Sequence, residues 1–208
     1  INGLASAINL ELERQINAFD RLGRRWSESP DITETVRDVD GGAQLQECPA
    51  SHSLALVNLE RQTVWHYPKR NPNGTPRLRV AHPLEPARLE AMDSVRRNLG
   101  AVLSATVLQS GLGPGFAIYA PVMRNGQLNG YVAGEFTYRR FFAGLEQRLK
   151  LASHYLCSIE VGGVRVFEAG GDASSEGDAI EKVFTLHGRR IRIALAPNAE
   201  HTRLNRRF

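Results

Sequence analysis

The sequence predicts an α+β fold in which a long N-terminal helix precedes two antiparallel sheets. Over residues 1–28, apolar side chains recur about every 3.7 positions, close to the helical repeat. Residues 101–137 contain three apolar-rich stretches separated by turn-forming sequences, and residues 155–196 contain four short strand-like stretches. A chain of 208 residues with 42% hydrophobic content can bury one good core or two small ones.

The N-terminal segment shows the strongest helical pattern in the chain. Its apolar residues fall on one stripe, its charged residues occupy the other faces, and Ser29-Pro30-Asp31 ends the segment. We therefore expect a long helix over residues 1–28 whose stripe faces a core. The stripe consists of Leu4, Ile8, Leu12, Ile16, Phe19, Leu22 and Trp26.

A first lobe is expected over residues 31–150. Its central strands are bounded by the turn sequences SGLGPG and RNGQ, and Asn125-Gly126 tolerates the positive φ that a tight hairpin needs. The segment 68–83, rich in Pro, Gly, Asn and Arg, is expected to be a loop. The expected strands are 54–58, 63–67, 101–109, 116–122 and 128–137. The expected helices are 31–40, capped by Asp31 or Thr33, 138–151, and 85–99 with Leu89, Met92, Val95 and Leu99 on one side.

A second, smaller lobe is expected over residues 151–197. Short apolar stretches alternate there with Gly-containing turns, which is typical of a small sheet. Residues 198–208 are predicted to start a helix that leads into a membrane span, so we expect the chain to be part of a longer membrane protein. The expected strands are 155–160, 164–168, 182–187 and 189–196.

Several classes of function lack the sequence features that they require. The chain has no metalloprotease, nucleophile-elbow, Walker A or kinase sequence, which disfavours an enzyme. The net charge of +4 comes from arginines spread through the chain, a pattern that favours a solvated surface over a nucleic-acid site. No stretch reaches about eighteen consecutive apolar residues, and no signal peptide pattern is present at the start.

Cys48 and Cys157 are the two cysteines of the chain. A disulfide between them would close a long loop and would suit an oxidising compartment. Two unpaired, buried thiols are equally compatible with the sequence. No Cys/His ligand spacing surrounds either residue, so we expect neither a metal nor a cofactor.

The order of residues in the central strands resembles a CHASE-type sensor domain. The resemblance rests on three stretches, Gly100-Ala-Val-Leu-Ser104, Gly115-Phe-Ala-Ile-Tyr-Ala-Pro121-Val122 and Gly130-Tyr131-Val-Ala-Gly134-Glu-Phe136. It implies two PAS-like lobes, a membrane-distal lobe that senses ligand and a membrane-proximal one. It also implies a place on the periplasmic or extracellular side of the cytoplasmic membrane and a homodimer formed through the N-terminal helix.

The same resemblance suggests where a ligand would bind in the first lobe. Ser104 and Tyr119 fall at pocket positions with a hydroxyl group, and Ala133 falls near a small residue that makes room for the ligand. His82 stands where the cytokinin receptors of this family have a carboxylate that holds the adenine ring, so the acceptor for a purine amine is missing and the resemblance does not extend to cytokinin. Neighbouring strands add further polar or aromatic candidates, each of which has ordinary sheet packing as its alternative: Thr106, Tyr131, Glu135 and Trp65.

The implied function is reception of an unidentified small molecule, which shifts the balance between two arrangements of a membrane protein. The signal would then reach a cytoplasmic output module, a histidine kinase, a diguanylate cyclase or a phosphodiesterase. One alternative is a periplasmic protein-interaction module without a small ligand, which would show an exposed apolar patch. The other is a small enzyme, in which titratable side chains would converge in a cleft.

Overall fold

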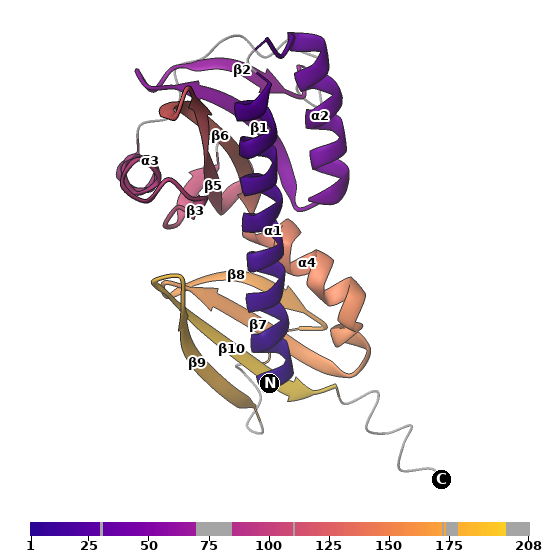
Figure 1. Cartoon of the computed structure of the whole chain (residues 1–208). Coiled ribbons are helices and arrows are strands. Elements are labelled where there is room, and N and C mark those ends of the chain that lie inside the picture. Colours follow the sequence, from indigo (N-terminus) through magenta and orange to yellow (C-terminus); the bar gives the residue numbers. More distant parts are fainter. Residues whose placement is uncertain (30, 70–84, 110, 172, 174–178, 199–208) are drawn as a thin grey trace. The chain divides into compact units, whose positions relative to one another are not determined.

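The computed structural model describes residues 1–29, 31–69, 85–109, 111–171, 173 and 179–198. Within these residues the helices are α1 (Asn2–Glu28), α2 (Glu34–Glu47), α3 (Pro86–Asn98) and α4 (Tyr138–Leu149), with a short 3₁₀ turn at Leu151–Ser153 (Figure 1). The strands of the first sheet are β1 (Ser51–Asn58), β2 (Thr63–Tyr67), β3 (Val102–Leu103), β4 (Val107–Gln109), β5 (Gly113–Arg124) and β6 (Gln127–Thr137). Those of the second sheet are β7 (Tyr155–Val161), β8 (Val164–Ala169), β9 (Ile180–Leu186) and β10 (Arg189–Pro197).

The chain divides into two compact units. The first lobe comprises Leu12–Thr137, and the second lobe comprises Ile1–Glu11 together with Tyr138–Phe208. Helix α1 therefore contributes to both lobes, and α4 belongs to the second lobe, whereas the sequence places residues up to 150 in the first. The reason is aromatic packing, because Phe142 of α4 lies against Phe167 of β8 with ring centroids 5.9 Å apart.

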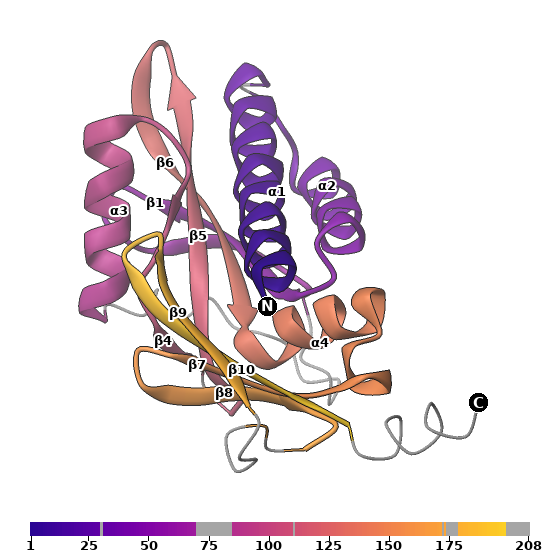
Figure 2. The ribbon, with the colours of Figure 1, turned by 90° about the horizontal axis from the view of Figure 1, so that it is seen from below.

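The first lobe is built on one antiparallel sheet with helices on both faces. Its strand order is β2-β1-β6-β5-β3, and β4 pairs separately with β5. Figure 2 shows α1 and α2 on one side of this sheet and α3 on the other. The predicted combination of an N-terminal helix and two antiparallel sheets is confirmed.

Helix α1 lies close against the first sheet because small residues face it. A Cβ atom on Gly134 would lie only 2.0 Å from Cζ of Phe19, and one on Gly23 would lie 2.6 Å from the carbonyl oxygen of Pro121. The predicted apolar stripe of α1 is largely buried within the chain itself, through Leu4, Ile8, Leu12, Phe19, Leu22 and Trp26. Its main role is therefore core formation.

The opposite face of the first sheet packs against α3. The apolar cluster there joins small residues of β1 with one side of the helix, so the helix can approach the sheet closely. Its members are Ala55, Val57, Ala91, Met92, Val95, Ala117, Tyr119, Tyr131 and Ala133. The β5–β6 hairpin turns at Asn125 and Gly126, whose φ angles of 50° and 76° confirm the predicted tight turn.

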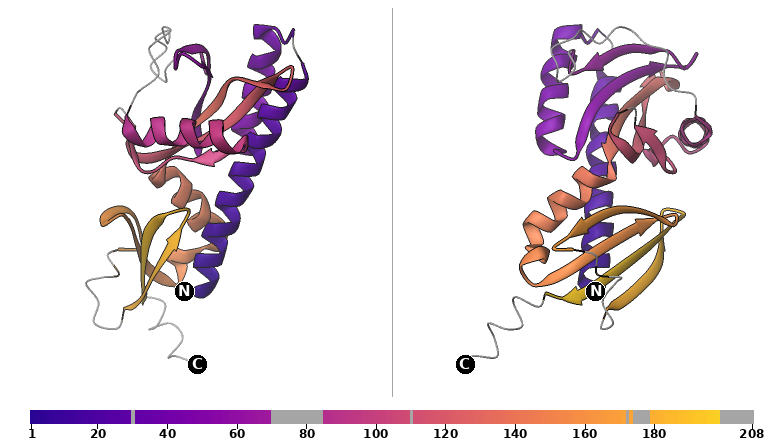
Figure 3. Two further views of the ribbon diagram at one scale, coloured as in Figure 1. Left: turned by 60° about the vertical axis from the view of Figure 1, so that its left-hand side comes forward. Right: turned by 180° about the vertical axis from the view of Figure 1, so that it is seen from behind.

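The second lobe has a four-stranded antiparallel sheet in the order β8-β7-β10-β9. Helix α4 buries Tyr138, Phe141, Phe142 and Leu145 and packs on β8 (Figure 3). The first residues of α1 complete this lobe, since Lys182 Nζ donates to Asn2 Oδ1 at 2.6 Å and Arg148 Nη2 lies 2.8 Å from Glu11 Oε2.

Three expectations from the sequence need correction. The strand expected over 101–109 is divided into β3 and β4, because the Ser104 hydroxyl accepts the Ala117 N–H at 2.9 Å and interrupts the backbone ladder. The helix expected over 31–40 runs over Glu34–Glu47 with Thr33 as its N-cap. The alternative of a disulfide is wrong, because Cys48 and Cys157 are buried free thiols.

Two further findings concern the membrane. The predicted helix start over 198–208 lies outside the described residues apart from Asn198. Among the helices that the structure describes, none is both long and apolar enough to span a bilayer.

Candidate ligand-binding site

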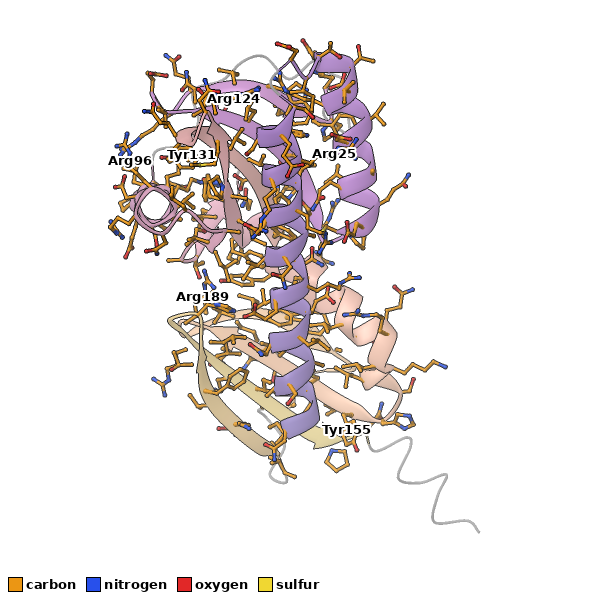
Figure 4. The ribbon with its side chains drawn as sticks, viewed as in Figure 1. Arg25, Arg96, Arg124, Tyr131, Tyr155 and Arg189 are labelled. Atoms are coloured by element: carbon orange, nitrogen blue, oxygen red, sulfur yellow. The ribbon has the colours of Figure 1, made fainter. Side chains whose placement is uncertain are left out.

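The structure brings four of the predicted site residues to one face of the first sheet. Tyr119 lies on β5, and Tyr131, Ala133 and Glu135 lie at alternate positions of β6, so all four point to the side covered by α3. Tyr119 is directly opposite Ala133 in the antiparallel register. Tyr131 lies farther along β6, toward Arg96 of α3 (Figure 4).

Arg88 of α3 joins this face and organises its polar groups. Its side chain is 2% exposed. Arg88 Nη1 donates to Glu135 Oε1 in an ion pair, and it also lies 3.4 Å from the Tyr119 hydroxyl oxygen. Arg88 Nε donates to Glu85 Oε2 at 2.6 Å. A buried guanidinium thus holds two carboxylates and a phenol together beside the apolar cluster.

Gln109 at the end of β4 completes the group, which we call the Arg88 cluster: Glu85, Arg88, Gln109, Tyr119 and Glu135. Gln109 Nε2 donates to Glu135 Oε2 at 2.5 Å, and Gln109 Oε1 lies 3.5 Å from Arg88 Nη2. Glu135 therefore accepts from both Arg88 and Gln109. The carboxylate needs these donors because its side chain is only 12% exposed.

Glu135 favours the protonated forms of both Arg88 and Tyr119. Burial by itself lowers the pKa of Arg88, but the charge and hydrogen bond of Glu135 raise it by more, so the guanidinium stays ionised. Burial and the Glu135 charge raise the pKa of Tyr119, so the phenol keeps its proton at neutral pH. The formal charges of Glu85, Arg88 and Glu135 sum to one negative charge, and the most exposed member is Glu85 at 39%.

Three further predicted site residues, Trp65, Ser104 and Thr106, are not part of the Arg88 cluster. Trp65 lies on the α2 side of the sheet, where its Nε1 donates to Asp38 Oδ1 at 2.9 Å. The Ser104 hydroxyl is buried and serves the backbone, as an acceptor from Ala117 N and a donor to the Ala105 carbonyl oxygen at 2.7 Å. Thr106 is exposed between β3 and β4. His82 lies outside the described residues.

Glu85, Arg88 and Gln109 were missed by sequence reasoning. Arg88 stands four residues before Met92 and seven before Val95, on the apolar side of a helix. An arginine on such a side signals a buried partner carboxylate, because an unpaired charge would be too costly there. No comparable sequence signal marks Gln109.

The second lobe has a groove of about 560 Å³ between α4 and β8. Its charged lining residues include Arg139, Glu146, Arg165 and Glu168. Arg165 pairs with Glu168 at 2.9 Å, with both side chains at least one-third exposed. Such water-screened pairs select a ligand weakly compared with the buried Arg88 cluster.

Solved structures with a similar fold cover nearly the whole chain. No protein-family model matches the sequence, and no significant match was found among curated proteins. Among the similar structures is an extracellular ligand-binding receptor from Desulfohalobium retbaense, with 14% identity, a TM-score of 0.64 and 93% of this chain covered. This chain spans only 38% of that receptor's length.

Two chemoreceptor domains are similar over nearly their full length. One is the ligand-binding domain of the Pseudomonas aeruginosa amino acid chemoreceptor PctC in complex with GABA, with 17% identity, a TM-score of 0.59, and 93% of this chain and 95% of that chain covered. The other is the ligand-binding domain of the Pseudomonas fluorescens chemoreceptor CtaA in complex with L-alanine, with 13% identity, a TM-score of 0.57, and 97% and 95% covered. At these identities the likeness shows that the chain has the double-lobed fold of such sensor domains.

Proposed function

We propose that this chain is the extracytoplasmic ligand-sensing domain of a membrane-bound signal-transduction protein. It binds a small molecule in its first lobe and relays the change to a cytoplasmic output. The observation that carries the proposal is the Arg88 cluster, in which Arg88 and the Glu135 carboxylate are largely buried beside the apolar cluster on the α3 side of the sheet. Buried charged groups are expensive for stability alone, which favours a functional role.

The charge of the cluster indicates the class of ligand. Two carboxylates accompany one guanidinium, and the carboxylates are the more exposed groups. A ligand with an ammonium group is therefore attracted to Glu85 and Glu135. The proposed ligand is a small amine or amino acid, which agrees with the GABA and L-alanine named for the two similar chemoreceptor domains.

The finer features that the sequence suggests belong to the same proposal. They are a CHASE-type rather than another sensor family, a location in the periplasm or outside the cell, and a kinase, cyclase or phosphodiesterase as the output. Dimerisation through α1 would have to use surface that the chain's own core leaves free, such as Leu10, which is 71% exposed.

A thermal-shift screen of the purified chain tests the ligand proposal, because a ligand that binds only the folded state raises Tm. The screen should contain amino acids, simple amines, organic acids, nucleobases and peptides. Tyr119→Phe and Glu135→Gln change the cluster, and Tyr67→Phe is the matched control on β2, beside α2 on the other side of the sheet. His82→Ala tests the predicted residue outside the described part of the chain.

The expected result is a Tm increase with one or more amines or amino acids that Glu135→Gln abolishes and Tyr67→Phe preserves. A shift that survives both cluster substitutions but disappears with His82→Ala would support ligand binding, but at a site other than the Arg88 cluster. A shift confined to organic acids without an amino group would contradict the proposed ligand class.

A further inference from the structure

A small cavity lies in the first lobe, on the side of the sheet that carries α1 and α2. Its volume of about 90 Å³ is roughly three times the ~30 Å³ share of a water molecule in the liquid, enough for a group the size of acetate or phosphate. Two arginines and no acidic residue line it. The lining residues are Trp26, Ile32, Arg37, Leu56, Val57, Asn58, Val64, Val122, Arg124, Asn129 and Gly130.

The two arginines come from different elements and have unused donors. Arg37 lies on α2, with its guanidinium carbon 6.0 Å from the ring centroid of Trp26. Arg124 is the last residue of β5, before the hairpin turn (Figure 4). Arg37 Nε and Arg124 Nη1 are buried, and neither has a hydrogen-bond partner among the described residues. Buried N–H groups of charged side chains are rarely left in that state.

The surrounding charges do not neutralise these arginines. Burial lowers the pKa of Arg37, the charge of Arg124 lowers it further, and Glu34 opposes both effects. Glu34 is exposed and pairs with Lys69. The Asp40 carboxylate accepts from Trp26 Nε1 at 3.0 Å and lies 2.8 Å from Arg25 Nη2. The cavity therefore keeps an excess of positive charge.

We propose that this cavity is a binding site for a small oxyanion, held between Arg37 and Arg124. A carboxylate, sulfate or phosphate group would accept from the two unused N–H donors and would relieve the repulsion between the guanidinium groups. The site is separate from the Arg88 cluster, which lies on the opposite face of the same sheet. It does not depend on the proposed sensing of an amine.

The chain carries its own reporter for this site. Trp26 lines the cavity, and Trp65, the other tryptophan of the sequence, lies 5.2 Å from it between ring centroids. Tryptophan fluorescence of the 208-residue chain can therefore be titrated with sodium phosphate, sulfate or acetate. Sodium chloride at equal ionic strength is the reference for each titration. The three anions distinguish a tetrahedral oxyanion site from a carboxylate site.

The expected result is a saturable fluorescence change with at least one oxyanion and none with chloride. Arg124→Gln is expected to weaken that binding at least tenfold, yet to melt in chloride at or above the wild-type Tm because it removes one of two repelling charges. Arg97→Gln is the matched control, since it changes the same charge at an exposed position of α3. It should leave the titration unaltered.

Arg37→Gln repeats the test from the α2 side of the cavity and decides the question if Arg124→Gln does not fold. Equal responses to chloride and to all three oxyanions would overturn the proposal. An affinity unchanged in a folded Arg37→Gln or Arg124→Gln variant would overturn it as well.

Discussion

Removal of Arg88 should destabilise the first lobe mainly by leaving Glu135 without its cation. In Arg88→Met the carboxylate, with its 12% exposed side chain, keeps only the Gln109 donor at 2.5 Å. Breaking one side of a buried pair costs about 3–5 kcal/mol, and because one donor remains, the expected loss is about 3 kcal/mol. Glu135→Gln should cost less, about 1–3 kcal/mol, because Arg88 retains Glu85 at 2.6 Å.

The double variant Arg88→Met/Glu135→Gln should lose less than the sum of the two single losses, by about 1–3 kcal/mol. Urea unfolding followed by tryptophan fluorescence measures this coupling in the first lobe, since both tryptophans lie there and the two lobes need not unfold together. Arg97→Met is the control on the same helix and should change stability by no more than about 0.5 kcal/mol. Additive losses in the double variant would refute the assigned pairing.

Three further predictions concern individual positions. Gly134→Ala should destabilise the chain by about 1–3 kcal/mol, because its Cβ would meet the Phe19 ring. Gly144→Ala on α4 meets nothing within 4 Å and should stabilise the chain by about 0.4–1 kcal/mol. Urea unfolding of the two variants compares these effects. Ser104→Ala leaves a buried amide unpaired and should cost about 1–3 kcal/mol in the same assay, while unchanged stability would contradict the ladder role of its hydroxyl. Burial raises the pKa of Cys157 from its ordinary 9.0 to about 11. The unfolded chain therefore loses this proton at lower pH than the folded chain, and the stability that the neutral thiol contributes is lost as pH rises from 9 to 11. Tm measured across that range should fall more steeply in wild type than in Cys157→Ala.

The sequence was sufficient for the parts of the fold that local patterns determine. The stripe of α1 and the Asn125-Gly126 turn depend on residues near one another in the chain, and both are confirmed. The break between β3 and β4 was not predictable, because it depends on the Ser104 hydroxyl replacing a backbone partner of Ala117 across the sheet.

Of the candidate site, only the residues on β5 and β6 were predictable from the sequence. Tyr119 and Glu135 were proposed from their positions on β5 and β6, and the alternation of side chains in the sheet places them on one face. Arg88 was missed because its partner Glu135 is 47 residues away. Their contact depends on how α3 docks, which periodicity alone does not specify.

The close approach of α1 to the first sheet at Gly23 has a consequence for how this helix can change in evolution. The glycine fixes the rotation of the helix, since any side chain there would meet the Pro121 carbonyl oxygen. The same helix buries Phe19 in the first lobe, where its ring faces Gly134 of β6. Deleting one residue between Phe19 and Gly23 would turn Phe19 by about 100° relative to Gly23 and take its ring away from Gly134. In related chains, length changes in this part of α1 should therefore occur in steps of about seven or eleven residues, which preserve the face of the helix.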